Sequence, residues 1–187
     1  MSGLLKLSAL LDSILTFFAK IGAWCGFFLV LVVLYDVITR YAGVPKPFGL
    51  NSTQIQESEY WLHSFLFALM IGYAYIKQAH VRIDLVRERF PKKVKFGLEI
   101  FGCLAFLIPY SIVVCVYSWT YAYTSFLEGE VSKSVIGLTN IWILKMSMPL
   151  MFLLLFIAAV SQLIKSVAGF TGNLPDNRHG QALGGDN

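Results

Sequence analysis

Four apolar runs with few charged residues constrain this chain more than any other feature. They cover about residues 21–39, 60–77, 97–120 and 141–164. Each is close to the ~20 residues that an α-helix needs to cross a bilayer, and each is too long for a strand. Since backbone groups in lipid must be hydrogen-bonded within their own segment, the sequence predicts an all-α membrane protein with four transmembrane helices.

The composition agrees with lipid as the main solvent of these runs. Hydrophobic residues make up 57% of the 187-residue chain and charged residues only 14%, whereas about 25% of the residues of a soluble domain are charged. We therefore expect a single membrane domain over residues 1–168. Residues 169–187 contain turn formers and little that could be buried, so we expect them to form a disordered cytoplasmic tail.

The segment before the first run has the pattern of an amphipathic helix. Lys6, Ser13 and Lys20 share one side of such a helix, and the opposite face carries Leu4, Leu7, Leu10, Leu11, Ile14, Leu15 and Phe18. This pattern predicts a helix over residues 1–20 that lies in the membrane interface. Because Lys20 separates it from the first run and no small-residue cleavage pattern follows closely, we do not expect a cleaved signal peptide.

Basic residues are concentrated in the connection between the second and third runs. This connection holds Lys77, Arg82, Arg87, Arg89, Lys92, Lys93 and Lys95, whereas the other two hold Arg40 with Lys46, and Lys133. The positive-inside rule then predicts that this connection and both chain termini are cytoplasmic. We expect anionic lipid head groups to contact Arg87, Arg89, Lys92, Lys93 and Lys95. Nucleic acid is a poor partner, because the cluster borders two spans and lacks aromatic residues placed for stacking.

The same connection contains a pattern that charge alone does not explain. His80, Arg82 and Asp84 alternate with apolar residues, unlike one face of a helix, and Pro91 follows where a new helix can begin. We therefore predict a short, non-helical connector with a fixed shape.

The first run carries two local patterns. Asp36 and Arg40 are four residues apart near its end, so they can pair along one helix edge. A contact of either residue with a partner chain is the alternative. Gly22 and Gly26 form a GxxxG spacing, which allows a second helix to approach closely.

Charged residues also lie at the same side of the membrane in the second and fourth runs. Glu59 and His63 are four residues apart, Glu57 lies just before them, and Lys145 lies one turn into the fourth run. We expect Lys145 to neutralise one of these carboxylates, with His63 as a further group for ion pairing.

Prolines and cysteines occupy the interior of the runs. Pro109 and Pro149 predict kinks in the third and fourth spans. The cysteines have no CxxC or other ligand spacing, and we interpret them as reduced packing residues: Cys25, Cys103 and Cys115.

The sequence contains little that points to catalysis or a cofactor. It has no HExxH, GxSxG, P-loop or dinucleotide motif. His63 and His80 are 17 residues apart on one predicted helix, about 25 Å, and cannot bind one metal. The ionisable groups gather at the membrane faces, so we expect no enzyme activity and no substrate, metal or catalytic site in this chain. A membrane-anchor subunit of a respiratory enzyme and a small autonomous transporter or channel remain as alternatives.

Several elements in order resemble a known family. They are the stretch from Asp36 through Arg40 to Tyr41, then Glu59, Gly72, the segment His80-Val81-Arg82-Ile83-Asp84-Leu85, and Pro91. Together with four spans, they cover residues 20–165 and resemble the DctQ-like small membrane subunit of tripartite ATP-independent periplasmic (TRAP) transporters.

This resemblance implies a non-catalytic partner in the bacterial inner membrane. In such transporters a large multi-span subunit holds the sodium and substrate sites, and a periplasmic binding protein delivers the substrate, mostly an organic acid. The small subunit would enlarge the scaffold, with phospholipid around it and no cofactor of its own. Its structural or interface residues would be Asp36, Arg40, Tyr41, Glu59, Gly72, His80, Arg82, Asp84 and Pro91. The two outer connections, within residues 40–59 and 120–140, are longer than in many relatives, and we predict that they help to contact the binding protein or cover the large subunit.

Overall fold

The computed structural model describes residues 2–43, 51–79, 89–134, 136–174 and 182–183. All regular elements of this part are helices: α1 (Ser2–Tyr41), α2 (Ser52–Ile76), α4 (Lys92–Gly102), the π-helical turn η2 (Cys103–Leu107), α5 (Ile108–Leu127) and α6 (Ile141–Phe170). The predicted all-α class is confirmed for these residues.

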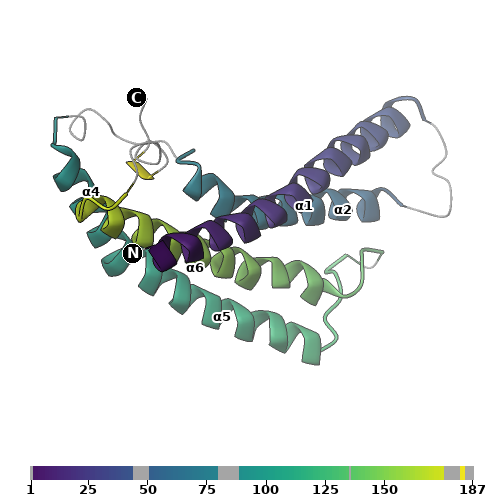
Figure 1. Cartoon of the computed structure of the whole chain (residues 1–187). Coiled ribbons are helices and arrows are strands. Elements are labelled where there is room, and N and C mark those ends of the chain that lie inside the picture. The colour runs from purple at the N-terminus through teal and green to yellow at the C-terminus, as the bar shows by residue number, and fades with distance from the viewer. Residues whose placement is uncertain (1, 44–50, 80–88, 135, 175–181, 184–187) are drawn as a thin grey trace.

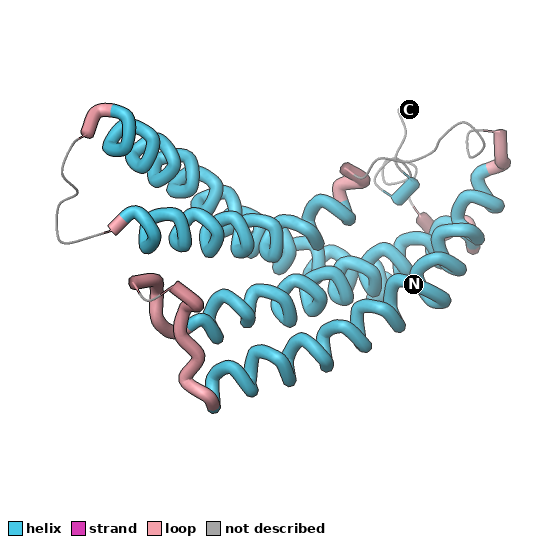
Figure 2. The backbone as a smooth tube through the Cα atoms, turned by 180° about the vertical axis from the view of Figure 1, so that it is seen from behind, coloured by secondary structure: helices cyan, strands magenta, loops and turns pink. Residues whose placement is uncertain are grey.

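Helix α6 is the central element. Helix α5 packs along one side of α6, and α2 packs along another side, with α1 resting on both α2 and α6. The elements meet where α1 begins and spread apart toward the opposite end, where α1 and α5 are farthest from each other (Figures 1 and 2). We call the first end the basic end, defined by Lys77, Arg89, Lys92, Lys93 and Lys95. The other is the glutamate end, defined by Glu57, Glu59, Glu128 and Glu130.

Three helical segments of the described chain are long and apolar enough to cross a membrane. They are Gly3–Tyr41, Lys92–Leu127 and Ile141–Phe170. Helix α2, which contains the predicted second span, is not among them, because its first half carries polar residues such as Gln56, Glu57 and Glu59. The four-span count therefore stays a prediction.

Helix α1 is one continuous element. The sequence predicted an interfacial helix over 1–20 followed by a span over 21–39, but α1 runs for 40 residues without a break. No proline or helix-stopping motif separates the two parts, so the expectation of two elements is wrong. At 1.5 Å per residue α1 is about 60 Å long, twice the thickness of a hydrocarbon core.

Only part of the predicted apolar face of the first half of α1 is buried against the other helices. Leu4, Leu7 and Leu10 are exposed, whereas Ser8 and Leu15 are buried. Leu15 belongs to the main apolar core, together with Leu69, Ile76, Leu154 and Ala158. The buried face of α1 is thus partly polar near its start.

Helix α2 begins earlier than its apolar run because a capping box starts it. Asn51 accepts a hydrogen bond from the Gln54 backbone N–H at 2.9 Å, and the Gln54 side chain accepts one from the Asn51 N–H at 3.5 Å. This reciprocal pair satisfies two backbone donors that a helix start otherwise leaves without partners. Residues 52–59, predicted to lie in a connection, are therefore helical.

The third run forms a continuous helical segment made of α4, η2 and α5. Pro91 is the N-cap of α4, at the predicted helix start. A π turn lies just before Pro109, where we predicted a kink, and in this turn the Ile108 N–H donates to the Cys103 carbonyl. A wider turn accommodates a proline that lacks an N–H and would clash with the preceding turn.

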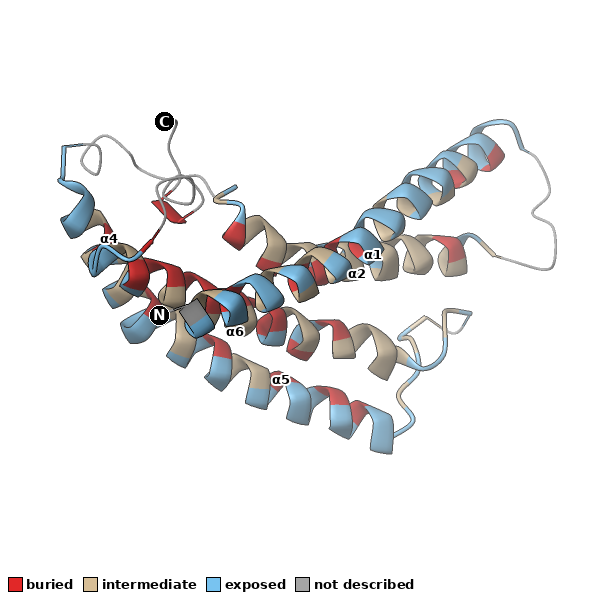
Figure 3. Ribbon diagram, viewed as in Figure 1, coloured by how far each residue is buried: buried red, intermediate tan, exposed pale blue. Residues whose placement is uncertain are grey.

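Helix α6 passes through Pro149 and ends at Phe170. Buried residues line much of α6, whereas most of α5 is exposed (Figure 3). Beyond α6, Leu174, Ala182 and Leu183 are buried in one cluster with Phe96 of α4 and Ala168 of α6. The predicted disordered tail over 169–187 is therefore wrong for these described residues, and its other residues lie outside the described part.

Candidate functional site

Hydrogen bonds attach the connection between α5 and α6 to the start of α2. Glu57 accepts hydrogen bonds from the Ser132 hydroxyl and from the Leu138 backbone N–H. The Asn51 side chain donates to the Ile136 carbonyl at 3.1 Å. Because a charged acceptor makes the stronger kind of hydrogen bond, Glu57 holds this connection in one place at the glutamate end.

A second carboxylate links this connection to α6. Lys145 forms an ion pair with Glu130 and lies 4.0 Å from the centre of the Tyr121 ring. Ser125 also donates to Glu130 at 2.6 Å. The hydrogen bond from Lys145, followed by that from Ser125, lowers the pKa of Glu130 below its ordinary value.

The sequence therefore predicted the wrong partner for Lys145. We expected it to neutralise Glu57 or Glu59, but the ammonium group pairs with Glu130. Glu130 lies in a connection, and no spacing in the sequence links it to a residue of α6 fifteen positions later.

Other predicted polar residues lie near the same end. Asp36 and Arg40 form an ion pair on α1, and Tyr41 is exposed. His63 packs edge-on against Phe67, with 4.7 Å between the ring centres. None of these contacts directs a charged group into the apolar middle of the helices.

Glycines permit the closest helix contacts. A Cβ atom on Gly72 would lie 2.7 Å from Leu15 Cδ2 and 2.8 Å from the Leu154 carbonyl oxygen, which is closer than real Cβ contacts. Gly72 is thus the point where α1, α2 and α6 meet. Gly22 and Gly26 of the GxxxG pattern face α2, and a Cβ on Gly22 would lie 3.1 Å from its nearest side-chain atoms.

A polar cluster joins α1 to α6 at the basic end. Lys165 Nζ lies 2.6 Å from Asp12 Oδ2, and the Ser161 hydroxyl donates to Asp12 Oδ1 at 2.6 Å. The Ser8 and Ser161 hydroxyls are 2.9 Å apart. We did not predict this cluster from the sequence, although Ser8 with Asp12 and Ser161 with Lys165 are matched pairs at helical spacing. That repeated spacing was the available signal.

The predicted connector lies largely outside the described residues. His80, Arg82, Asp84 and Arg87 fall in residues 80–88, which are outside the described part of the chain. On its far side Lys95 is half-buried, and the exposed residues are Arg89, Pro91, Lys92 and Lys93.

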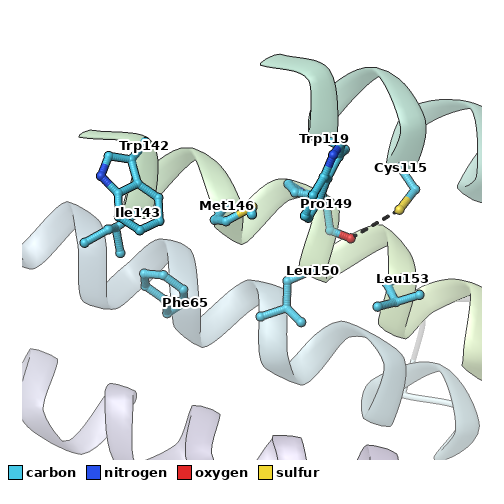
Figure 4. Close-up of a pocket in the computed structure, with 9 residues that line it drawn as sticks. All are labelled: Phe65, Cys115, Trp119, Trp142, Ile143, Met146, Pro149, Leu150 and Leu153. Atoms are coloured by element: carbon cyan, nitrogen blue, oxygen red, sulfur yellow. Dashed lines mark hydrogen bonds between the residues drawn. The ribbon is translucent and has the colours of Figure 1, made fainter. Parts of the chain in front are cut away.

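An apolar groove runs between α2 and α5, with α6 as its floor (Figure 4). Its volume is about 510 Å³. It contains Phe65 of α2, Cys115 and Trp119 of α5, and Trp142, Met146 and Leu150 of α6. The Cys115 thiol is 3.6 Å from the Pro149 carbonyl oxygen. Such a lining suits apolar groups and offers no charged side chain to a polar substrate.

The described residues contain no group of three or more His, Cys, Asp or Glu side chains that could hold a metal. The three cysteines are free thiols.

The family model for the DctQ component of tripartite ATP-independent periplasmic transporters matches residues 29–169. No curated protein and no solved structure matches the chain. The matched region begins inside α1 and ends near the end of α6, so it includes all the described helices except the first part of α1.

Proposed function

Since the chain belongs to the DctQ family of TRAP transporter components, we propose that it is the non-catalytic small membrane subunit of a sodium-coupled importer of an organic acid. In this proposal it sits in a bacterial inner membrane, with the basic end and both termini in the cytoplasm. The large membrane subunit binds sodium and substrate, and this chain enlarges its static scaffold.

The arrangement of charge is the observation that supports this role. Asp12 with Lys165 and Glu130 with Lys145 are ion pairs within the chain. The Asp36–Arg40 pair is also internal. These pairs lie toward the ends of the helices, as in a structural element. A transporting chain typically has polar groups aimed at a midplane site between broken helices.

We assign the groove between α2 and α5 to a helix of the large subunit. The groove extends from Trp142 in the first turn of α6 to Leu153 farther along that helix. TRAP transporters contain a second membrane component that can supply a helix to fill it. Its floor is α6, the most buried of the three membrane-spanning candidates, so the groove has a rigid base. Aromatic and methionine side chains in the groove are the types enriched in the cores of protein interfaces.

The connection between α5 and α6, at the glutamate end, is the basis for a second proposed contact, with the periplasmic binding protein. Glu57 and Glu130 fix it to α2 and α6, and in the proposed orientation it faces the periplasm. It therefore offers a preformed surface on which the periplasmic binding protein can dock.

Cross-linking from natural cysteines tests the groove assignment. Two single-cysteine variants, one retaining Cys115 in the groove and one retaining Cys25 on α1, are coexpressed with the large subunit carrying introduced cysteines. We expect the complex to copurify, and we expect Cys115 but not Cys25 to form cross-links.

The respiratory-anchor alternative gains no support from the described residues. Two results together would contradict the proposal. The large subunit would purify without this chain, and the maleimide reactivity of Cys115 would be unchanged by the large subunit. Failure to cross-link with normal copurification would overturn the groove assignment alone.

A further inference from the structure

The buried pair Ala182–Leu183 has no function in the proposed scaffold role. These residues lie eight and nine positions beyond Leu174, yet Ala182 is fully buried and Leu183 is only 8% exposed. Both belong to one apolar cluster with Phe96 of α4, Ala168 of α6 and Leu174. A short apolar piece near the carboxyl terminus thus packs against helices that are distant in sequence.

A buried side chain binds the backbone of this pair. The Ala182 carbonyl accepts a hydrogen bond from the Gln162 side-chain amide of α6, and the Gln78 amide, just after α2, donates to it at 3.3 Å. Gln162 is fully buried. Loss of the carbonyl would leave this buried amide donor without its protein partner, which is costly in an apolar environment.

The helices around the pair are themselves in close contact. A Cβ atom on Gly169 of α6 would lie 2.3 Å from the Phe96 ring of α4. Leu5 of α1 packs against the same apolar cluster. The pair therefore contacts a junction at which the first part of α1, the chain after α2, the start of α4 and the end of α6 meet.

We propose that Ala182–Leu183 is an intramolecular clamp that holds this junction closed at the basic end. The Ala182 carbonyl satisfies Gln162, and Leu183 covers the apolar surface of Phe96 and Ala168. The clamp acts within the isolated chain and needs neither the large subunit nor the binding protein.

Two truncations that differ by two residues test the clamp. The chains 1–183 and 1–181 carry Leu174→Cys as the only cysteine and are reconstituted in nanodiscs. Leu174 is 5% exposed in the closed junction. We expect a water-soluble maleimide to label 1–181 roughly tenfold faster, the ratio that burial of one leucine side chain can produce. Circular dichroism serves to show that both chains retain their helices.

Point variants of the full chain repeat the test without truncation. Leu183→Asp should label as fast as 1–181, whereas Leu183→Met keeps an apolar side chain of similar volume and should label as slowly as 1–183. A second measurement is the hydrogen exchange of α4 and α6 in variants that keep the natural cysteines. We expect faster exchange when the clamp is removed. Equal labelling of both truncations, with Leu183→Asp matching Leu183→Met, would overturn the clamp.

Discussion

At the scale of single residues, the structure explains why position 72, which matches the family pattern, holds a glycine. From the sequence, we singled out Gly72 only because it lies between Glu59 and His80 in the series of residues that resembles the family. In the structure the backbone of Leu154 and the side chain of Leu15 occupy the space that a Cβ would need. The Leu154 carbonyl belongs to the backbone of the central helix α6, so it cannot move aside as a flexible side chain can.

Gly72→Ala should therefore destabilise the chain. We expect a loss of about 1–3 kcal/mol in the free energy of unfolding, typical of overpacking in a close-packed core. Thermal unfolding in detergent measures it. Gly102→Ala is the matched control, because no atom beyond its chain neighbours and its own helix backbone lies within 4 Å of its added Cβ, and alanine is the better helix former. Equal stability of the two variants would show that the helices do not meet at Gly72.

We predict that Glu130 makes the stability of the chain dependent on pH. Its pKa is lowered from the ordinary value of 4.5, first by the hydrogen bond from Lys145 and then by that from Ser125. A carboxyl with a lower pKa in the folded state stabilises that state above its unfolded pKa. This contribution is lost as the pH falls through the folded value.

We therefore expect the wild-type chain to lose stability below about pH 4.5 more steeply than Glu130→Gln does. Glu128→Gln is the control, since Glu128 is an exposed neighbour in the same connection. The measurement is the unfolding temperature between neutral and acidic pH in a fixed detergent. Identical pH profiles for wild type and Glu130→Gln would contradict the ion pair.

At the scale of helices, the apolar runs located the elements but not their ends. The run over 141–164 corresponds to α6, and the run over 97–120 lies within the segment from α4 to α5. Hydropathy indicates which part of a helix lies in lipid or in the protein core, whereas capping residues determine where the helix begins. Asn51 with Gln54 extends α2 into a polar region, and nothing stops α1 near Lys20.

Contacts between helices were harder to predict than contacts within one. Asp36 and Arg40 pair at a spacing that can be seen in the sequence, and the structure contains that pair. Asp12 and Lys165 are separated by most of the chain, so only the packing of α1 on α6 brings them together. The sequence gives their residue types but not the crossing point of the helices.

The Asp12–Lys165 pair should fix how α1 lies on α6. Lys165 is 8% exposed and Asp12 is 28% exposed, so Asp12→Asn leaves a mostly buried ammonium group without its counter-charge. Removing one partner of a fully buried pair costs about 3–5 kcal/mol, and we expect a smaller loss here because water reaches Asp12.

Replacing both partners, as Asp12→Leu with Lys165→Met, should recover much of the loss, because no unpaired charge remains. Chemical denaturation of both variants and wild type in mixed micelles provides the comparison. A double variant less stable than Asp12→Asn would argue against an isolated ion pair in this position.

At the scale of the whole molecule, orientation links the charge pattern to the proposed function. We predict that the basic end is cytoplasmic and the glutamate end is periplasmic. In cysteine-free chains, Lys133→Cys should react with an impermeant maleimide added outside spheroplasts. Lys93→Cys should react only after the membrane is opened. The reverse pattern would show an inverted chain, and labelling of both from outside would contradict the span count.

The central claim is that this chain supports transport without performing it. The most direct measurement is sodium-driven uptake of a radiolabelled organic acid into proteoliposomes, with its binding protein outside. Vesicles would contain this chain alone, the large subunit alone, or both. We predict uptake at full rate only with both subunits and none with this chain alone. Sodium-driven uptake by this chain alone would contradict the account.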